Sequence, residues 1–339
     1  MSQPTHFILP DLVAHSTAFT DATNPHWERA AAESKEWVNS YKVFADRRRA
    51  FFLQGQSELL VSHAYPYAAY QEFRTICDFV NLLFVIDEIS DEQGAGDARL
   101  TGDIFLHVLR DPTWTDGSKV AHITKDFVNR LLVTIKPNTL RRFIDRCQAY
   151  IDAVVEEASL RERNEVLDLT AFTILRRENS AVRACFSLIP YALGIDLPDE
   201  VINDSVVHRL HLAGVDMVCW ANDLYSYNME LSSGLAGNNF VTVLMRTQDM
   251  DIQSACDYAG VVYKALMDSF VADKARLPSF GAVDADVLRY VEASQQWAIG
   301  NIVWSFETPR YFGANRHEIK KTRMVPLKPV DLEPLADDE

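Results

Sequence analysis

The sequence has few of the residues that interrupt helices or cross-link chains. Among its 339 residues there are 13 glycines and 13 prolines, and alternation of apolar and polar residues is scarce, which disfavours a sheet-rich fold. The five cysteines form no C-x-x-C pair, which argues against a zinc site or a disulfide framework and favours a reducing compartment. No apolar run approaches the length of a membrane span, and the first residues lack the pattern of a signal peptide. We therefore expect a cytoplasmic protein that does not enter a membrane.

Positive charge is also in short supply. Lysine and arginine number 33 against 48 acidic residues, and the net charge of −15 argues against nucleic acids and anionic membranes as partners. Apolar residues make up 48% of the chain, which is enough for a large core. Helical periodicity covers residues 30–41, 51–89, 126–160, 201–230, 252–275 and 284–306. We expect Pro66 to interrupt the second of these segments, and residues 136–138 to form a break within the third.

These patterns predict a compact all-α protein. Residues 1–325 are expected to form one helical domain, whose long apolar helices surround a central cavity. Residues 326–339 carry several prolines and end in acidic residues, which predicts a mobile acidic tail.

One helical segment carries three oxygen-bearing side chains at equal spacing. Asn222, Ser226 and Glu230 follow one another at intervals of four residues. On a helix this spacing places all three on one face, one turn above another. An amide oxygen, a hydroxyl and a carboxylate together suit a hard divalent cation such as Mg²⁺. An ordinary polar helix face would show the same pattern.

A second acidic cluster follows a long apolar segment. Residues 79–86 are mostly apolar and run directly into Asp87 and Asp91, which lie on one face of a helix. Like charges at this spacing repel each other, and a cation between them reverses the sign of the interaction. The alternative is a solvated helix end that runs into the loop at residues 94–96. Two such clusters in one chain favour a metal site.

Together the two clusters resemble the metal signature of class I terpene synthases, and within that family the sesquiterpene synthases of basidiomycete fungi. Residues 87–91 match the D-(D/E)-x-x-D motif of the family, and residues 222–230 match its N-D-x-x-S-x-x-x-E motif. The resemblance extends from Phe7 to about Gly313 and implies the isoprenoid synthase bundle around a central cavity. It also implies three Mg²⁺ ions, with Mn²⁺ as an alternative, that hold a substrate diphosphate. The implied metal ligands are Asp87, Asp91, Asn222, Ser226 and Glu230.

Two further segments extend this resemblance. Arg310 and Tyr311 are similar to the C-terminal R-Y pair that contacts the diphosphate in the family. Arginine suits this role because its planar fork donates two hydrogen bonds to phosphate oxygens. One departure is Met229, which stands where many relatives carry a lysine before the final glutamate of the second motif. One diphosphate contact is therefore missing, while the metal ligands are intact.

Residues 176–180 resemble the diphosphate sensor and the helix break beside it. By spacing, Arg176 is favoured as the sensor, with Arg177 as the alternative. Asn179 then corresponds to the linker residue, and Ser180 to the effector residue, whose carbonyl faces the substrate.

The resemblance implies a lyase that acts on farnesyl diphosphate, with geranyl diphosphate as an alternative substrate. The substrate would ionise, isomerise through the nerolidyl form and cyclise to a sesquiterpene, with release of diphosphate. A linear terpene alcohol synthase that makes nerolidol or linalool is the alternative. The protein would be a monomer or a homodimer.

The walls of the substrate chamber must be dry, because a carbocation reacts with accessible water. Phe84 lies one turn before the first acidic cluster, and Trp304 lies on the last long helix. We predict that both rings face the carbocation. Asn238 and Asn239 belong to a glycine-containing loop, residues 234–239, that directly follows the second motif. This loop is a candidate lid, and its amides are candidate diphosphate contacts.

The motifs also bear on three other functions. A chain-elongating prenyltransferase of the same fold needs two D-D-x-x-D motifs, and here the second is replaced by the Asn-Ser-Glu set. A cyclase that begins by protonation needs a D-x-D-D motif, which the sequence lacks. The third is a helical scaffold protein whose acidic clusters are accidental, and it predicts that substitution of Asn222 or Glu230 leaves function intact.

Overall fold

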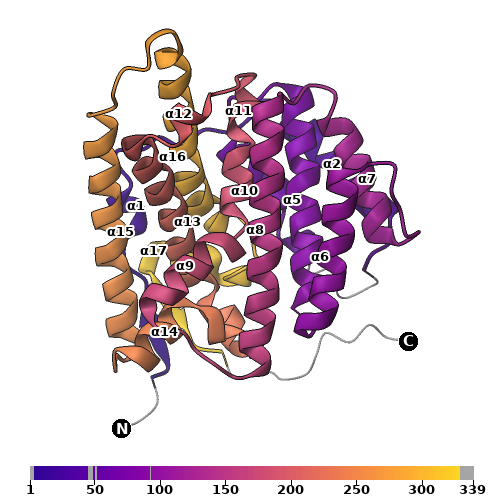
Figure 1. The fold of residues 1–339 in the computed structure, drawn as a ribbon. Coiled ribbons are helices and arrows are strands. Elements are labelled where there is room, and N and C mark those ends of the chain that lie inside the picture. The colour runs from indigo at the N-terminus through magenta and orange to yellow at the C-terminus, as the bar shows by residue number, and fades with distance from the viewer. Residues whose placement is uncertain (1–3, 45–48, 50–51, 92, 329–339) are drawn as a thin grey trace.

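The computed structural model describes residues 4–44, 49, 52–91 and 93–328. They form a bundle of long helices, and one short two-stranded sheet joins the two ends of the described chain (Figure 1). The predicted all-α fold class is confirmed. The helices are α1 (Leu12–His15), α2 (Trp27–Ser40), α4 (Ser57–Ala64), α5 (Tyr70–Ser90), α6 (Ala95–Arg110), α7 (Lys119–Leu131), α8 (Pro137–Glu162), α9 (Leu169–Asn179), α10 (Val182–Ser187), α11 (Ile189–Leu193), α12 (Asp199–Ile202), α13 (Ser205–Ser232), α14 (Phe240–Thr247), α15 (Ile252–Lys274), α16 (Asp284–Glu307) and α17 (Arg316–Thr322). Short 3-10 turns lie at Ala236–Asn238, Gly281–Val283 and Gly313–Asn315.

The long helices of the second half follow the predicted boundaries within one to four residues. α15 and α16 differ from their predicted ranges by a single residue at the C-terminal end. Pro66 separates α4 from α5, as expected from its missing N–H. The side-chain amide of Asn24 donates to the carbonyls of Tyr65 and Ala68 at this break, over 2.8 and 2.9 Å. The break is therefore a hydrogen-bonded corner of the fold. The first residue of the predicted 51–89 segment lies outside the described residues.

The predicted break at residues 136–138 is confirmed. It divides the segment 126–160 into α7 and α8, and Pro137 occupies the first turn of α8, where its missing N–H costs nothing. The expected loop at residues 94–96 needs revision. The glycines at 94–96 begin a full helix, α6, and do not form an extended loop. α6 packs closely on α8 at Gly102, where a Cβ atom would collide with Ile151. Tertiary packing at this glycine outweighs its low helix propensity.

Strands β1 (His6–Ile8) and β2 (Met324–Pro326) pair antiparallel, with Phe7 opposite Val325. The pairing continues at Leu327, whose N–H donates to the carbonyl of Thr5 over 2.9 Å. The N–H of Lys328 donates to the Asn228 side chain over 3.0 Å. Residues 326–328, predicted as the start of a mobile tail, are therefore hydrogen-bonded into the fold. The rest of that predicted tail lies outside the described residues.

None of the described helices combines the length and the apolar character that crossing a bilayer requires.

α4 and α16 approach each other closely at Gly300. A Cβ atom on Gly300 would lie 2.7 Å from the Cβ of His63 and 3.0 Å from its carbonyl carbon. Near the C-terminal end of α16, the indole Nε1 of Trp304 donates to the carbonyl of Gly55, just before α4, over 2.8 Å. This contact fixes the end of α16, from which Arg310 and Tyr311 follow.

Substituting Gly300→Ala is expected to destabilise the protein by about 2 kcal/mol, because the new methyl group meets backbone that cannot move aside. The matched control is Gly96→Ala in the first turn of α6, where no atom lies within 4 Å of the added Cβ. The control should be neutral or more stable, since alanine favours a helix over glycine. Urea unfolding of both variants measures the difference, and equal stabilities would contradict the packing described at Gly300.

Candidate functional site

The first acidic motif lies in the last turn of α5, at the end of a helix that is buried along most of its length. Burial raises the pKa of Asp87, and the charges of Arg310 and Arg176 oppose that rise. Burial also raises the pKa of Asp91 to about 9, with further contributions from the charges of Asp87 and Glu157. Both carboxyl groups therefore favour their protonated forms, and a cation bound between them would instead favour the ionised forms.

The second motif lies near the C-terminal end of α13, which runs unbroken through it. Asn222, Ser226 and Glu230 thus share one helix face, as the spacing predicted. The hydroxyl of Ser226 is buried and has no hydrogen-bond partner of good geometry among the described residues. Burial raises the pKa of Glu230 to about 7, the charge of Asp223 adds to the rise, and hydrogen bonds, one of them from Asn239, oppose it.

Arg176 connects this motif to the helix break after α9. Its guanidinium donates to Asp223 over 2.9 Å, to Asn222 over 2.7 Å and to Asn179 over 3.2 Å. The amide of Asn222 in turn donates to the hydroxyl of Tyr311 over 2.8 Å. Arg176 also acts on the charge of Asp87 across the site. Arg176 therefore contacts the second motif directly and is near enough to the first to affect the pKa of Asp87.

Arg177, the alternative sensor, points to a different part of α13. It forms a two-point ion pair with Asp216, with both distances 2.7 Å. The structure therefore brings Arg176, and not Arg177, against the side chains of the second motif.

The helix break itself is well defined. α9 ends at Asn179, Ser180 is its C-cap, and Ala181 adopts a left-handed conformation with φ of 57° before α10 begins. The amide of Asn179 donates to Glu157 on α8 over 2.7 Å. The predicted linker residue thus joins Arg176 to a carboxylate close to the first motif.

Arg310 and Tyr311 follow the end of α16, where Arg310 lies beside the first motif and Tyr311 contacts Asn222 of the second. Arg310 lies 3.9 Å from a carboxylate oxygen of Glu88, and its guanidinium lies 4.8 Å above the ring of Phe84. The ring of Tyr311 meets Trp304 edge to face, with centroids 5.5 Å apart. Trp304 is almost fully buried, so it packs against Tyr311 from the interior of the protein. Whether Phe84 and Trp304 also face a carbocation stays a prediction, as does the central cavity.

The two asparagines of the candidate lid differ in their surroundings. Asn239 is fully buried, and its amide donates to the Asp223 carbonyl and to Glu230, over 2.9 Å in each case. Its oxygen caps α14 by accepting from the N–H of Val241. Asn238 is half-buried in a 3-10 turn. Asn239 therefore orients the second motif, and a contact of either asparagine with diphosphate stays a prediction.

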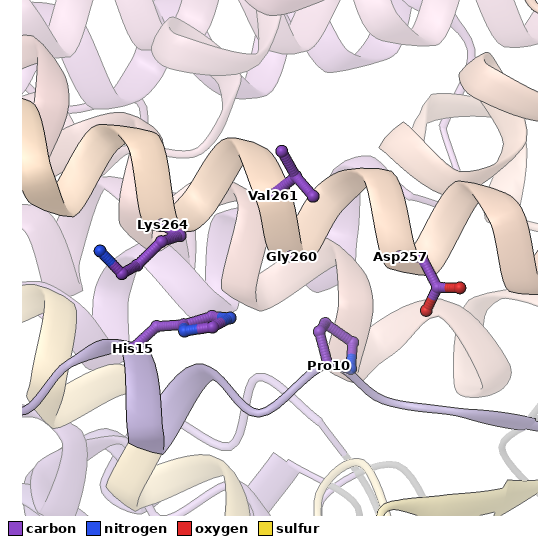
Figure 2. A pocket seen from close by; sticks show the side chains of 6 residues that line it. All are labelled: Pro10, His15, Asp257, Gly260, Val261 and Lys264. Atoms are coloured by element: carbon purple, nitrogen blue, oxygen red, sulfur yellow. The ribbon is translucent and has the colours of Figure 1, made fainter.

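A surface pocket of about 270 Å³ lies elsewhere in the molecule, between α15 and the N-terminal segment. Figure 2 shows Pro10 and His15 facing α15 at Gly260 and Lys264. None of the predicted site residues lines this pocket.

The donor set of the two motifs fits a hard divalent cation. All five candidate ligands offer oxygen, and the three half-buried carboxylates have raised pKa values. Within the described part of the chain, no three His, Cys, Asp or Glu side chains form a group that could hold a metal. An ion here would therefore need amide, hydroxyl, water or diphosphate oxygens beside the carboxylates, as Mg²⁺ commonly does.

Sequence reasoning missed Glu157 and Arg161, both on α8. Burial and the charge of Asp87 raise the pKa of Glu157, and Arg176 opposes this. Arg161 donates to the carbonyl of Ser90 over 3.0 Å and lies 3.6 Å from Asp91. It therefore binds the C-terminal end of α5. A signal was present for Glu157, because it falls on the apolar face of a helix, where an unpaired acid is rare.

Comparison with known families gives a match along more than half of the chain. The family model described as "Terpene synthase family 2, C-terminal metal binding" matches residues 78–269. This range includes both acidic motifs and the break after α9. The bifunctional terpene synthase Agr4 of Cyclocybe aegerita is 49% identical over 330 residues, which cover 97% of this chain and 95% of that protein.

Other relatives carry different names. A protein of Coprinopsis cinerea named linoleate 10R-lipoxygenase COP4 is 52% identical over 323 residues, which cover 95% of this chain and 93% of that protein. Among solved structures, hedycaryol synthase in complex with HEPES superimposes with a TM-score of 0.76 at 21% identity, covering 88% of this chain and 98% of that one. At this identity the superposition shows a shared fold.

Proposed function

Since the chain belongs to the terpene synthase family, we propose that it is a Mg²⁺-dependent sesquiterpene synthase that ionises farnesyl diphosphate and cyclises the resulting carbocation. The observation that carries the proposal is the position of Arg176. It contacts Asn222 and Asp223 of the second motif and acts on the charge of Asp87 in the first. A diphosphate between the motifs would meet this guanidinium and the metal ligands together.

The proposed ligands are Asp87 and Asp91 on one side and Asn222, Ser226 and Glu230 on the other. Three bound Mg²⁺ ions would neutralise the diphosphate and make it a better leaving group. Mn²⁺ offers the same oxygen preference and is the alternative ion.

The side chains around these ligands have separate tasks. Arg176 and Arg310 donate charge-assisted hydrogen bonds to the departing diphosphate, and the Tyr311 hydroxyl adds a third donor. Before substrate binds, Arg176 is held by Asn222, Asp223 and Asn179, so it needs little reorganisation to reach the phosphate. The Ser180 carbonyl, at the helix break, faces the allylic cation and favours its formation there.

Beyond the diphosphate site, water must be kept from the cation. Phe84 lies under Arg310, and Trp304 lies behind Tyr311, so both rings separate the charged groups from the apolar interior. We propose isomerisation through nerolidyl diphosphate followed by cyclisation. A linear alcohol synthase that makes nerolidol, or linalool from geranyl diphosphate, is the alternative and uses the same ionisation chemistry.

The candidate site does not favour the activity in the lipoxygenase name of one relative. All candidate ligands at the site are oxygen donors, which suit Mg²⁺ better than a redox-active iron.

Purified protein with farnesyl diphosphate and Mg²⁺ is expected to release diphosphate and a volatile C15 product, and EDTA should abolish the reaction because the leaving group is then not neutralised. Gas chromatography of the volatiles measures the product, and geranyl diphosphate in parallel measures the substrate preference. A linear C15 alcohol as the main product would select the alternative. Turnover that persists in EDTA, or no diphosphate release at all, would overturn the proposal.

A further inference from the structure

His63, in the last turn of α4, is a buried histidine with a carboxylate at each ring nitrogen. Its side chain is 2% exposed. Nδ1 lies 2.9 Å from Asp21 in the segment before α2, and Nε2 lies 3.1 Å from Glu307, the last residue of α16. His63 thus links two segments that are far apart in the sequence, outside the site described above.

The geometry determines which protonation state makes both contacts. An ionised carboxylate only accepts hydrogen bonds, and a neutral imidazole donates from one nitrogen only. Both contacts are therefore hydrogen bonds only when the ring is an imidazolium. Burial lowers the pKa of His63, but the hydrogen bonds and charges of Asp21 and Glu307 outweigh it and raise that pKa above its ordinary value. Among the described residues, the charged groups paired with the ring are Asp21 and Glu307.

The contact at Glu307 lies directly before the diphosphate-binding segment. Thr308 caps the C-terminal end of α16, with its N–H donating to the Trp304 carbonyl over 3.1 Å, and Arg310 and Tyr311 follow. On the other side, the segment that carries Asp21 is held to α4 by Asn24, whose N–H donates to the Ser62 carbonyl over 3.1 Å. The imidazolium therefore ties the end of α16 to a fixed part of the fold.

We propose that His63 is a positioning residue for Arg310 and Tyr311, because as an imidazolium it bridges Asp21 and Glu307 and so fixes the end of α16. This inference rests on the proposed function for its consequence in catalysis. The tie is complete while the ring is protonated and is lost as the pH rises through the pKa of folded His63. At high pH, Glu307 and the residues after it are held by one contact fewer.

The test compares the wild-type protein with His63→Gln, whose side chain is neutral at every pH. The ratio of the two kcat/KM values for farnesyl diphosphate is measured from about pH 6 to about pH 10. We expect roughly tenfold lower kcat/KM in the variant at the acidic end, because misplaced diphosphate donors slow the reaction. The ratio should approach one at the alkaline end, where the wild-type ring is also neutral. Taking a ratio cancels the titration of the metal ligands, which both proteins share.

A second measurement does not depend on turnover. Amide hydrogen exchange of Thr308 and of residues 310–312 should be faster in His63→Gln than in the wild type at about pH 6, and equal in both at about pH 10. The matched control is His122→Gln on α7, an exposed histidine, which should change neither readout.

A kcat/KM ratio that is the same at every pH, or equal exchange at about pH 6, would overturn the inference and leave the proposed function intact. If the wild type releases no diphosphate, the proposed function fails, and the exchange data still decide whether His63 fixes this segment.

Discussion

Substituting Asp87→Asn is expected to lower kcat/KM for farnesyl diphosphate about 10³-fold while making the protein more resistant to unfolding. The loss of activity follows from the proposed function, in which the carboxylate binds Mg²⁺, because the amide keeps its size but removes its charge. The gain in stability follows from the sign of the pKa shift. Burial raises the pKa of Asp87, so its ionised form is disfavoured in the folded state at neutral pH. Asparagine resembles the protonated form and avoids this cost, and we expect a melting temperature about 2 °C higher.

Two controls separate this effect from a general disturbance. Asp97→Asn removes an acid that is exposed in the first turn of α6, and it should leave kcat/KM unchanged. Addition of Mg²⁺ and inorganic diphosphate should raise the melting temperature of the wild type by mass action, and much less that of Asp87→Asn. Full activity in Asp87→Asn, or equal stabilisation of both proteins by the ligands, would show that Asp87 does not bind metal.

Substituting Arg176→Gln is expected to lower kcat/KM by about 10²-fold, because the departing diphosphate loses a charged donor. The substitution should also destabilise the protein, since Asp223 is buried with Arg176 as its ion-pair partner at 2.7 Å. Removing one partner of such a pair costs about 3 kcal/mol. Activity is therefore measured at a temperature well below the melting point of the variant, and unfolding is followed in parallel by circular dichroism.

Arg177→Gln is a closely matched control. Arg177 is the next residue of the same helix and also pairs with a largely buried aspartate of α13, Asp216, at 2.7 Å. Its loss should destabilise the fold as well, but by less because the pair is more exposed, and kcat/KM should change by no more than about threefold. The opposite ranking of the two variants in kcat/KM would assign the sensor role to Arg177.

Local rules were sufficient where the signal lay within one helix. The repeat of four residues that predicted a shared face for Asn222, Ser226 and Glu230 holds because α13 continues without a break to Ser232. Pro66 separates α4 from α5 for a similarly local reason, since proline lacks the N–H that a continuous helix needs. The glycines at 94 and 96 were misleading, because α6 begins at Ala95 despite their weak helix preference and packs on α8 at Gly102.

The surroundings of each motif depended on contacts between distant segments. Glu157 and Asn179 belong to helices that no motif connects, yet they share a hydrogen bond beside the first acidic cluster. Asn239, read as a lid residue, is buried because its amide satisfies the Asp223 carbonyl and Glu230. Val325 lies opposite Phe7 in a strand pair that joins the two ends of the chain, and a window of neighbouring residues carries no trace of such a partner.

The sequence by itself determined the helical class, the oxygen-bearing side chains of the two motifs and the helix face on which each motif lies. These follow from residue type and from the 3.6-residue period, and both are local. Only the tertiary structure decided that Arg176 and not Arg177 meets the second motif, and that His63 ties the end of α16. Adjacent residues on a helix point about 100° apart, so the packing of α9 against α13 determines which of the two arginines faces Asn222.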